Sequence, residues 1–307
     1  MAAAPATATS LFPDSPFTDK AVGTTSAAFL KLPVGARAEA MGGAAAGSSS
    51  GAESIFRNPA GLARLNAPKA TELIMTYSQL LADSYAGGMG LGRRAMGGTV
   101  GMGLIYFSQS SLTSYDAQGD VTGEFRPVDL ALSLSYARPV ENFLIGGSFK
   151  GIRSSLAGET GSSVAADVGV QALHVTNVGE GPLDVGAYLS QLGPPLKLGS
   201  VSSPLPFQAR TGFLWHASER MLGAVDIVLP VDHDPYVALG VELSHRHRQW
   251  AGFLRAGYNQ ARSRGLDGLA EVTAGAGLEF GSFRLDYAWI PFGDLGVTNR
   301  VALGFKL

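Results

Sequence analysis

The feature that most limits how this chain can fold is a strict alternation of side chains along it. Residues 128–137 read Val-Asp-Leu-Ala-Leu-Ser-Leu-Ser-Tyr-Ala, so large apolar side chains stand at every second position. Successive side chains of a β-strand point to opposite faces, which gives this segment one apolar and one polar face. The alternation recurs at residues 301–307. Many strands of about ten residues with this pattern are typical of an outer-membrane β-barrel.

The alternation predicts one all-β domain, a transmembrane antiparallel β-barrel over residues 69–307. We expect fourteen strands, at 69–79, 84–93, 98–108, 128–137, 143–153, 164–175, 182–190, 207–216, 220–229, 236–245, 250–259, 270–280, 283–290 and 299–307. After the second strand every other connection is short, and most of the others are longer, led by 109–127 and 191–206. Short periplasmic turns and long outer loops, with both termini in the periplasm, are typical of such barrels.

Charged and aromatic side chains fall on opposite faces of the predicted strands. A basic residue facing lipid at the bilayer midplane costs about 2–4 kcal/mol, so the charged face must line the lumen. The inward-facing charges are Asp129, Lys150, Asp167, Asp184, Arg210, Asp226, Glu242, Arg255, Glu271, Glu279, Arg284, Asp286 and Lys306. Because both signs are present, they are expected to pair across the lumen, to contact a plug, or to form a solvated, charge-balanced interior. Aromatic residues such as Tyr136 and Trp250 lie on the apolar face near strand ends, where they would meet the membrane interfaces.

Composition excludes several other classes of protein. The net charge is −2, with 23 basic and 25 acidic residues, so nothing indicates nucleic-acid binding. The absence of cysteine excludes disulfides and thiolate metal sites. Residues 95–115 form the longest uncharged stretch, but its glycines and polar residues make it unsuitable as a membrane-spanning helix. Since a barrel must be exported to the bacterial outer membrane, we expect that a signal peptide has been removed.

The first 68 residues lack the alternation and divide into two parts. Residues 1–26 are rich in Ala, Thr, Pro and Ser, which predicts a flexible lead-in. Residues 27–68 are rich in Gly and Ala. A glycine-rich segment of this kind can turn tightly and approach another backbone closely.

Two blocks of sequence resemble the PorV/PorQ family of outer-membrane barrels, which are related to the FadL fatty-acid channels. The first is Phe29-Leu-Lys-Leu-Pro-Val-Gly-Ala-Arg-Ala-Glu-Ala-Met-Gly-Gly, followed by Ser54-Ile-Phe-Arg-Asn-Pro-Ala-Gly-Leu-Ala. The second is Asp286-Tyr-Ala-Trp-Ile-Pro-Phe-Gly-Asp-Leu-Gly, followed by Asn299-Arg. The resemblance implies fourteen strands and an N-terminal segment, here 27–68, folded into the lumen as a plug. We expect plug contacts from Gly35, Arg37, Glu39, Met41, Gly42, Asn58 and Pro59, with Arg37 and Asn58 buried. The alternative is an extended periplasmic tail.

The resemblance implies two different functions. A PorV-like protein would dock with a type IX secretion translocon or its cargo through the long outer loops. Contact residues there would be Tyr115, Phe125, Pro194, Pro195 and Pro204, where proline lowers the entropy lost on docking. We prefer this hypothesis because the motifs match PorV more closely. The alternative is a FadL-like passive transporter with a hydrophobic ligand or detergent in its lumen and a lateral exit at a kinked strand beside the plug. Expected partners are outer-membrane lipid and envelope or secretion proteins.

Other motifs do not indicate an enzyme, a metal site or a cofactor. The run of glycines in 87–92 lies within a predicted strand, so it does not form a phosphate-binding loop and instead leaves room for a plug or a kink. His245 and His247 share one face of a strand end but flank two arginines and lack a third ligand. His216 is expected to face the lumen, but no nucleophile motif accompanies it.

Overall fold

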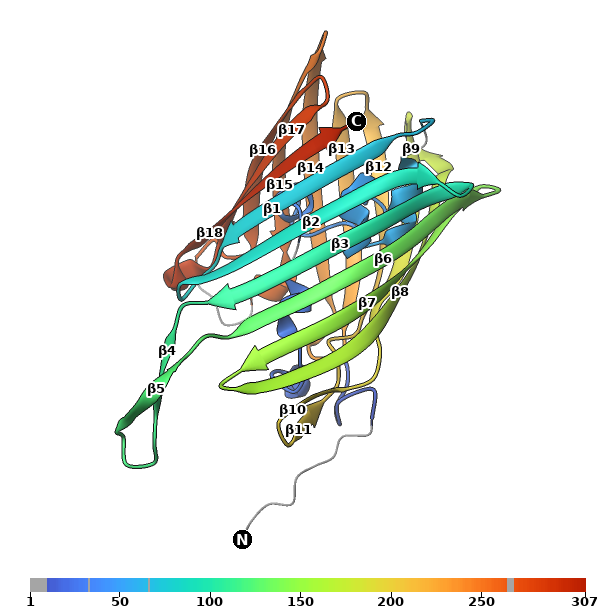
Figure 1. Ribbon diagram of the computed structural model, residues 1–307. Coiled ribbons are helices and arrows are strands. Elements are labelled where there is room, and N and C mark those ends of the chain that lie inside the picture. The colour runs from blue at the N-terminus through green and yellow to red at the C-terminus, as the bar shows by residue number, and fades with distance from the viewer. Residues whose placement is uncertain (1–9, 33, 66, 264–267) are drawn as a thin grey trace.

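Fourteen antiparallel strands form a closed barrel in the computed structural model (Figure 1), which describes residues 10–32, 34–65, 67–263 and 268–307. The strands lie at the fourteen predicted positions, with ends that differ by a few residues. In chain order they are β1 (Thr71–Gln79), β2 (Ser84–Ala95), β3 (Gly98–Gln109), β6 (Val128–Val140), β7 (Phe143–Leu156), β8 (Glu159–Val178), β9 (Gly181–Leu192), β12 (Gln208–Ser218), β13 (Met221–Pro230), β14 (Tyr236–His247), β15 (Trp250–Asn259), β16 (Val272–Phe280), β17 (Phe283–Pro291) and β18 (Val297–Lys306). The predicted fold class is confirmed.

The first and last barrel strands close the cylinder. β1 pairs with β18 in antiparallel register, with Glu72 opposite Lys306 and Gln79 opposite Asn299. Each other strand pairs with the next barrel strand along the chain. Two additional hairpins, β4 (Leu112–Tyr115) with β5 (Val121–Phe125) and β10 (Leu196–Leu198) with β11 (Val201–Ser203), lie within the two longest predicted loops.

The two faces of the wall have the polarity that the alternation predicts. On β6, Leu132 and Leu134 point outward and are 48% and 55% exposed, whereas Ser133 points inward and is 0% exposed. Outward-facing leucine and valine side chains remain exposed on most strands, as a lipid-facing surface requires. Among the described residues no helix combines the length and apolarity needed to cross a bilayer.

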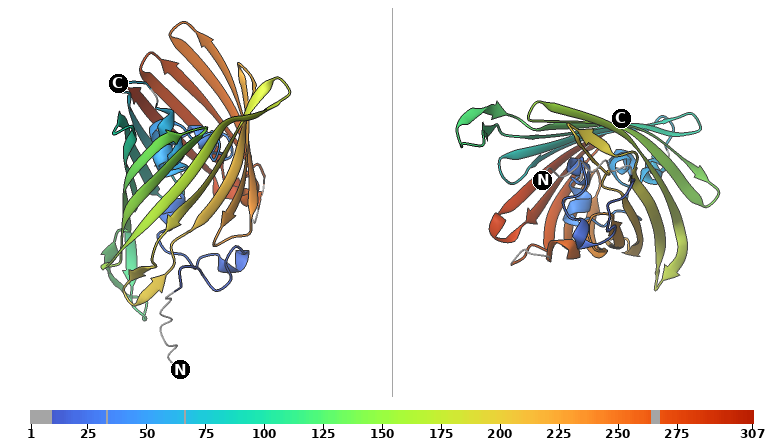
Figure 2. Two further views of the ribbon diagram at one scale, coloured as in Figure 1. Left: turned by 90° about the vertical axis from the view of Figure 1, so that its right-hand side faces the viewer. Right: turned by 90° about the horizontal axis from the view of Figure 1, so that it is seen from below.

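The N-terminal segment lies inside the barrel, as the views in Figures 1 and 2 show. We call residues 27–65 the plug, which contains the short helices η2 (Ala28–Lys31), α1 (Arg37–Ala40), η3 (Gly51–Phe56) and η4 (Pro59–Arg64). Most plug side chains are buried, and Met41, Ile55 and Leu62 are 0% exposed. Outside the plug, η1 (Asp19–Ala21), η5 (Gln260–Ser263) and η6 (Gly293–Leu295) are single turns.

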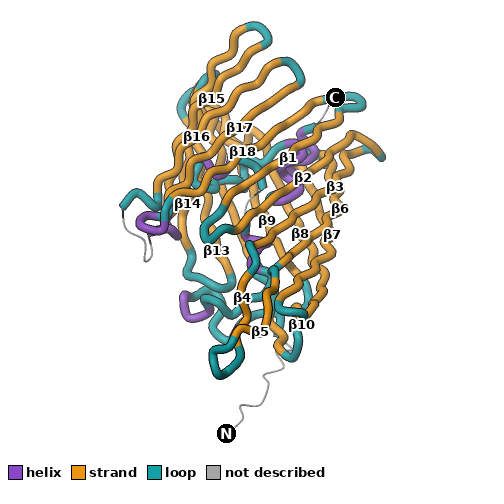
Figure 3. Tube along the Cα trace, turned by 60° about the vertical axis from the view of Figure 1, so that its left-hand side comes forward, coloured by secondary structure: helices purple, strands orange, loops and turns teal. Residues whose placement is uncertain are grey.

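The two ends of the described chain lie at opposite ends of the barrel. Turns are short at the end that holds the C-terminus (Figure 3), and at the other end the connections are longer except for the two-residue turn between β7 and β8, so we assign the long-loop end to the outer side. The prediction that both termini face the periplasm is wrong for residues 10–26, which lie at the long-loop end. Phe17 N donates a hydrogen bond to Val231 O over 2.8 Å, and Ser26 N donates to Pro204 O over 2.9 Å. The alternation of side chains indicates on which side each strand begins and ends, but it says nothing about the residues before β1. Those residues run through the lumen, so the chain that precedes them lies at the opposite end of the barrel.

Candidate functional site

Glycines on the inward face of the wall make room for the plug. A Cβ atom at Gly88 would lie 2.5 Å from Cγ1 of Val34, and one at Gly90 would lie 3.0 Å from the Phe56 ring. Both glycines belong to the glycine run 87–92 in β2. The absence of side chains there leaves space for Val34 and Phe56 of the plug. Similar contacts recur on β3, β7, β8, β9 and β14 to β16. Inward-facing glycine on strand after strand is thus a sequence signal for a filled lumen.

The turn after α1 lies directly against the wall. Gly42 has φ +70°, and a Cβ atom there would meet the carbonyl groups of Leu239 and Tyr258. Asn259 Nδ2 donates to Gly42 O over 2.7 Å. Beside it, Met41 packs against Ala224 and Ala238. Glycine is required at this turn both for its left-handed backbone and for its lack of a side chain.

A chain of ion pairs connects the plug to the inward face of the wall. Arg37 Nε donates to Glu242 Oε2 over 2.8 Å, and Arg255 Nε donates to the same oxygen over 2.7 Å. Arg255 Nη1 donates to Asp286 Oδ1 over 2.8 Å, and Asp286 Oδ2 accepts from Arg284 Nε over 2.5 Å. The charges of β14, β15 and β17 are therefore paired with each other and with the plug. Arg37 keeps 17% of its side chain exposed.

Other plug residues bind the wall through hydrogen bonds. Asp226 Oδ2 accepts from the backbone nitrogens of Ala45 and Ala46 over 2.7 and 2.9 Å. Its partner Arg210 donates to Gly43 O over 2.6 Å. Gly35 N donates to Thr76 Oγ1 over 3.1 Å.

Asn58 fixes the second half of the plug and is 0% exposed. Its Nδ2 donates to Ala46 O over 2.9 Å and to Val170 O on β8 over 3.1 Å. Its Oδ1 accepts from Ala60 N over 3.2 Å, so the side chain also caps η4, whose first residue is Pro59. One amide therefore joins two parts of the plug and the wall.

The remaining inward charges occupy different surroundings. Asp167 is buried beside Lys150, with 2.6 Å between Oδ2 and Nζ. Asp129 is half-buried on β6, and Glu271 is half-buried just before β16. At the short-turn end, Asp184 accepts from Arg64 of the plug over 3.3 Å. The wall charges thus meet the plug at several heights along the lumen.

The five predicted loop residues divide into exposed and buried groups. Tyr115 on β4 is 63% exposed, and Pro194 is also exposed. Phe125 and Pro195 are half-buried. Pro204 is buried, so its assignment to a partner-binding surface is wrong. The loop after β11 folds back over the barrel mouth, where Pro204 O accepts a hydrogen bond from Ser26 N.

An apolar pocket of about 660 Å³ lies at the outer mouth, between the start of the plug, the wall and the loop hairpins. We call it the mouth pocket. Phe29 and Leu32 of the plug line one side, and Leu156 and Leu198 lie among its other walls. Among the described residues that line the pocket, Asp129 is the acidic one. The pocket has the apolar lining and the size of a site for a small hydrophobic molecule.

A second, more polar cavity of about 350 Å³ lies in the lumen beyond η2, and we call it the lumen chamber. Leu32 lines both cavities, whereas Phe29 faces the mouth pocket and Leu30 faces the chamber. The short helix η2 therefore separates them.

Residues of the loop 231–235 and of the plug line the chamber on its outer side. Lys31 Nζ donates to Asp232 Oδ2 over 2.7 Å, and Thr25 Oγ1 donates to the same oxygen over 2.7 Å. His233 Nδ1 lies 3.0 Å from Asp232 Oδ1. Burial alone would raise the pKa of Asp232, but the hydrogen bonds from Lys31 and His233 lower it. Asp232 is therefore held as a carboxylate that fastens the loop to the plug.

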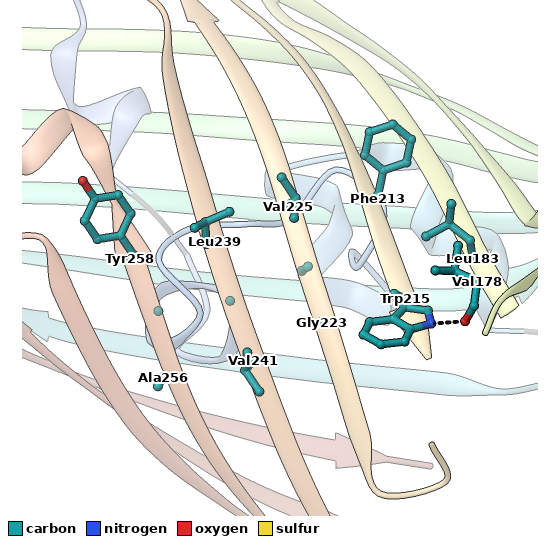
Figure 4. Close-up of a pocket in the computed structure, with 13 residues that line it drawn as sticks. Val178, Leu183, Phe213, Trp215, Gly223, Val225, Leu239, Val241, Ala256 and Tyr258 are labelled. Atoms are coloured by element: carbon teal, nitrogen blue, oxygen red, sulfur yellow. Dashed lines mark hydrogen bonds between the residues drawn. The ribbon is translucent and has the colours of Figure 1, made fainter. Parts of the chain in front are cut away.

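The third cavity, of about 640 Å³, is apolar and forms a groove on the outer surface of the wall, across β12 to β15 (Figure 4). Phe213, Val225 and Leu239 project from the strands there, in front of the wall and away from the plug. Trp215 Nε1 donates to Val178 O over 2.8 Å at one side of the groove. Lipid is the expected occupant of this outward surface.

The fold is a closed fourteen-strand antiparallel barrel with an apolar exterior, a plugged lumen and an apolar pocket at its outer mouth. Solved structures share this fold. The toluene transporter TbuX of Ralstonia pickettii aligns with a TM-score of 0.57 at 14% identity, over 89% of this chain and 97% of TbuX. The toluene transporter TodX of Pseudomonas putida gives 0.56 at 14% identity, over 89% and 96%. The monoaromatic hydrocarbon channel CymD gives 0.54 at 13% identity, over 90% and 97%.

Sequence comparisons provide no further assignment, because no family model and no curated protein matches the chain. At 13–14% identity the structural likeness establishes the fold. It supports the FadL side of the expected resemblance and adds nothing specific to PorV or PorQ.

Proposed function

We propose that the protein is a passive transporter of hydrophobic small molecules across the bacterial outer membrane. The mouth pocket is the observation that carries this proposal. It presents Phe29 and Leu156 to the outer side of a barrel whose fold is that of hydrocarbon channels. A hydrophobic solute leaving water for such a pocket gains about 25 cal/mol for each Å² of apolar surface that it buries.

The route inward from the mouth pocket passes the plug. η2 separates the pocket from the chamber, and the polar contacts of Lys31 with Asp232 and of Arg37 with Glu242 hold the plug in place. A filled lumen excludes free flow of water and ions, so a solute can pass only if plug residues move. Transport down a concentration gradient requires no energy source beyond that gradient.

The secretion-partner hypothesis ranks second and has one supporting observation. The β4–β5 hairpin projects beyond the barrel (Figure 1) and exposes 63% of Tyr115 and 66% of Val121. Exposed apolar residues on a projecting hairpin suit contact with another protein. The likeness to hydrocarbon channels favours transport.

Uptake measurements with a charge placed in the mouth pocket test the proposal. Leu198 lines the pocket from the β10–β11 hairpin, outside the barrel wall, so Leu198→Asp should leave the barrel intact. A carboxylate without a partner opposes entry of an apolar solute. We expect uptake of a labelled alkylbenzene into vesicles with a lipopolysaccharide outer leaflet to fall about tenfold. The matched control is Val121→Asp, which adds the same charge on the neighbouring hairpin, away from the pocket.

Two outcomes would reject the transport proposal. One is uptake by the wild type no faster than by vesicles without protein. The other is equal uptake by the wild type and Leu198→Asp. Loss of a co-purifying envelope protein in Val121→Asp, with uptake unchanged, would instead support the secretion-partner hypothesis.

A further inference from the structure

Four arginine side chains line the lumen chamber: Arg57, Arg210, Arg262 and Arg300. Each has one buried guanidinium nitrogen without a hydrogen-bond partner in the described part of the protein, namely Nε of Arg57 and Arg210 and Nη1 of Arg262 and Arg300. Arg57, Arg210 and Arg300 are 8%, 8% and 3% exposed. Buried polar groups in proteins nearly always find partners. Carboxylate oxygens without a partner lie near two of these arginines: Glu53 Oε1 is 4.0 Å from Arg57 Nε, and Asp226 Oδ1 belongs to the partner of Arg210. Nη1 of Arg262 and Nη1 of Arg300 remain as the donors that need a further acceptor.

Three of these arginines gather around one plug carboxylate. Glu39 Oε1 lies 3.1 Å from Arg57 Nη2, and Glu39 Oε2 lies 3.0 Å from Arg262 Nη2 and 3.7 Å from Arg300 Nη1. Arg300 also donates through Nε to Ser78 Oγ over 2.6 Å. A single carboxylate cannot accept from all the donors that these three guanidinium groups present.

The charges of this cluster do not cancel. Glu53 lies 4.0 Å from Arg57 and is the second carboxylate near the group. Three positive charges thus face two negative ones, which leaves one positive charge in surplus. The fourth arginine, Arg210, is balanced by Asp226 at 3.4 Å. The surplus lies at the wall of a cavity that can hold a ligand.

We propose that the lumen chamber binds a small oxyanion, a carboxylate or a phosphate, among Arg57, Arg262 and Arg300. Guanidinium groups bind both anions through paired, charge-assisted hydrogen bonds. The chamber volume of about 350 Å³ is roughly ten times the share of one water molecule in the liquid, so an oxyanion with a short organic chain fits. Phe56 and Phe292 line the same chamber and would contact such a chain. The anion would supply the acceptors that Glu39 cannot.

This site adds a ligand class to the proposed transport function, and it can be tested separately. The ligands in the names of TbuX, TodX and CymD, toluene and monoaromatic hydrocarbons, are uncharged. Anion binding in solution tests the chamber, whereas alkylbenzene uptake tests the passage. Either result can fail while the other holds.

The test measures binding to the full chain in non-ionic detergent by calorimetry, with sodium phosphate, octanoate, octyl phosphate and the neutral analogue octanol as probes at constant ionic strength. We expect saturable binding of at least one anion and an affinity at least tenfold weaker in Arg300→Gln, because a charge-assisted donor is lost. The control is Arg284→Gln, an inward arginine of β17 that pairs with Asp286 and does not line the chamber. Its affinity should stay within twofold of the wild type.

The probes distinguish the source of the anion. Binding of inorganic phosphate indicates a free ion, whereas binding of octanoate or octyl phosphate alone indicates the head group of an amphiphile. Both support an oxyanion site. Equal binding of octanol and octanoate, or no saturable binding of any anion, would overturn it. If Arg300→Gln does not fold, Arg262→Gln replaces it, since that side chain belongs to η5 outside the wall; wild-type affinity in this variant would also refute the proposal.

Discussion

The ion pair between plug residue Arg37 and wall residue Glu242 allows a measurement of how firmly the plug is held. Arg37 Nε lies 2.8 Å from Glu242 Oε2, and Arg255 Nε lies 2.7 Å from the same atom. In Glu242→Ala both arginines lose this carboxylate, and removing one partner of a buried pair costs about 3–5 kcal/mol. Arg255 retains Asp286, and Arg37 retains the carbonyl group of Ser48. We therefore expect the lower limit, about 3 kcal/mol of unfolding free energy.

The reverse change should cost less. In Arg37→Met the carboxylate of Glu242 still accepts from Arg255, and the lost contacts are two hydrogen bonds of 2.8 and 3.2 Å to Glu242 and one of 3.2 Å to Ser48 O. Hydrogen bonds to charged groups contribute about 1.5–3 kcal/mol each, and partial exposure of Arg37 reduces the loss to about 2 kcal/mol. Because both variants remove the same interaction, the double variant should be less destabilised than the sum by about 1.5–2 kcal/mol.

Denaturant unfolding in lipid vesicles, followed by tryptophan fluorescence, gives the required free energies. Glu279→Ala is the control, since that residue pairs with Lys306, whose side chain is 50% exposed. An exposed pair of this kind contributes about 1 kcal/mol or less. Strictly additive costs for Arg37→Met and Glu242→Ala would refute the claim that this pair holds the plug to the wall.

Three further predictions follow from the plug contacts. Gly257→Val places a side chain where the plug backbone lies and should raise ion conductance in planar bilayers, whereas Gly252→Val, where an added Cβ meets nothing, should not. Asp232 has a lowered pKa, so its bond to Lys31 stabilises the fold above about pH 4 and is lost as the pH falls through that lowered value. The unfolding free energy of the wild type should therefore fall as the pH decreases from 7 to 3, and that of Asp232→Asn should fall less. The same pH dependence in both proteins would contradict this role of Asp232. Asn58→Ala leaves buried carbonyl groups without a donor and should cost about 1–3 kcal/mol in the same unfolding assay, a loss below 0.5 kcal/mol being inconsistent with this role.

The strands were predictable because their two faces lie in different environments. Lipid outside and polar groups inside force opposite side chains onto the two faces, so alternation such as that of Leu132, Ser133 and Leu134 locates each strand and its orientation. The β4–β5 and β10–β11 hairpins were missed for the same reason. They lie beyond the barrel wall, where no lipid-facing side imposes a pattern.

The site was predictable in part. Parity placed Glu242 in the lumen, but its pairing with Arg37, 205 positions earlier, depends on the path of the plug. Arg57 and Arg262 lie on irregular segments that carry no periodicity, so the sequence offered no reason to combine them. Arg300 had a signal, since it lies on the inward face of β18 together with Ala302 and Gly304 and alternates with the outward-facing Val301 and Leu303. The direction in which the plug runs had none.

The route of the plug also restricts the order in which the molecule can assemble. Residues 27–65 cross the interior from the outer mouth to the start of β1, and β1 joins β18, which follows all the other barrel strands along the chain. Once that seam has formed, threading the segment would require pushing a bulky chain past folded loops. The open sheet must therefore curl around residues that are already in position, so the interior is filled before the cylinder is complete.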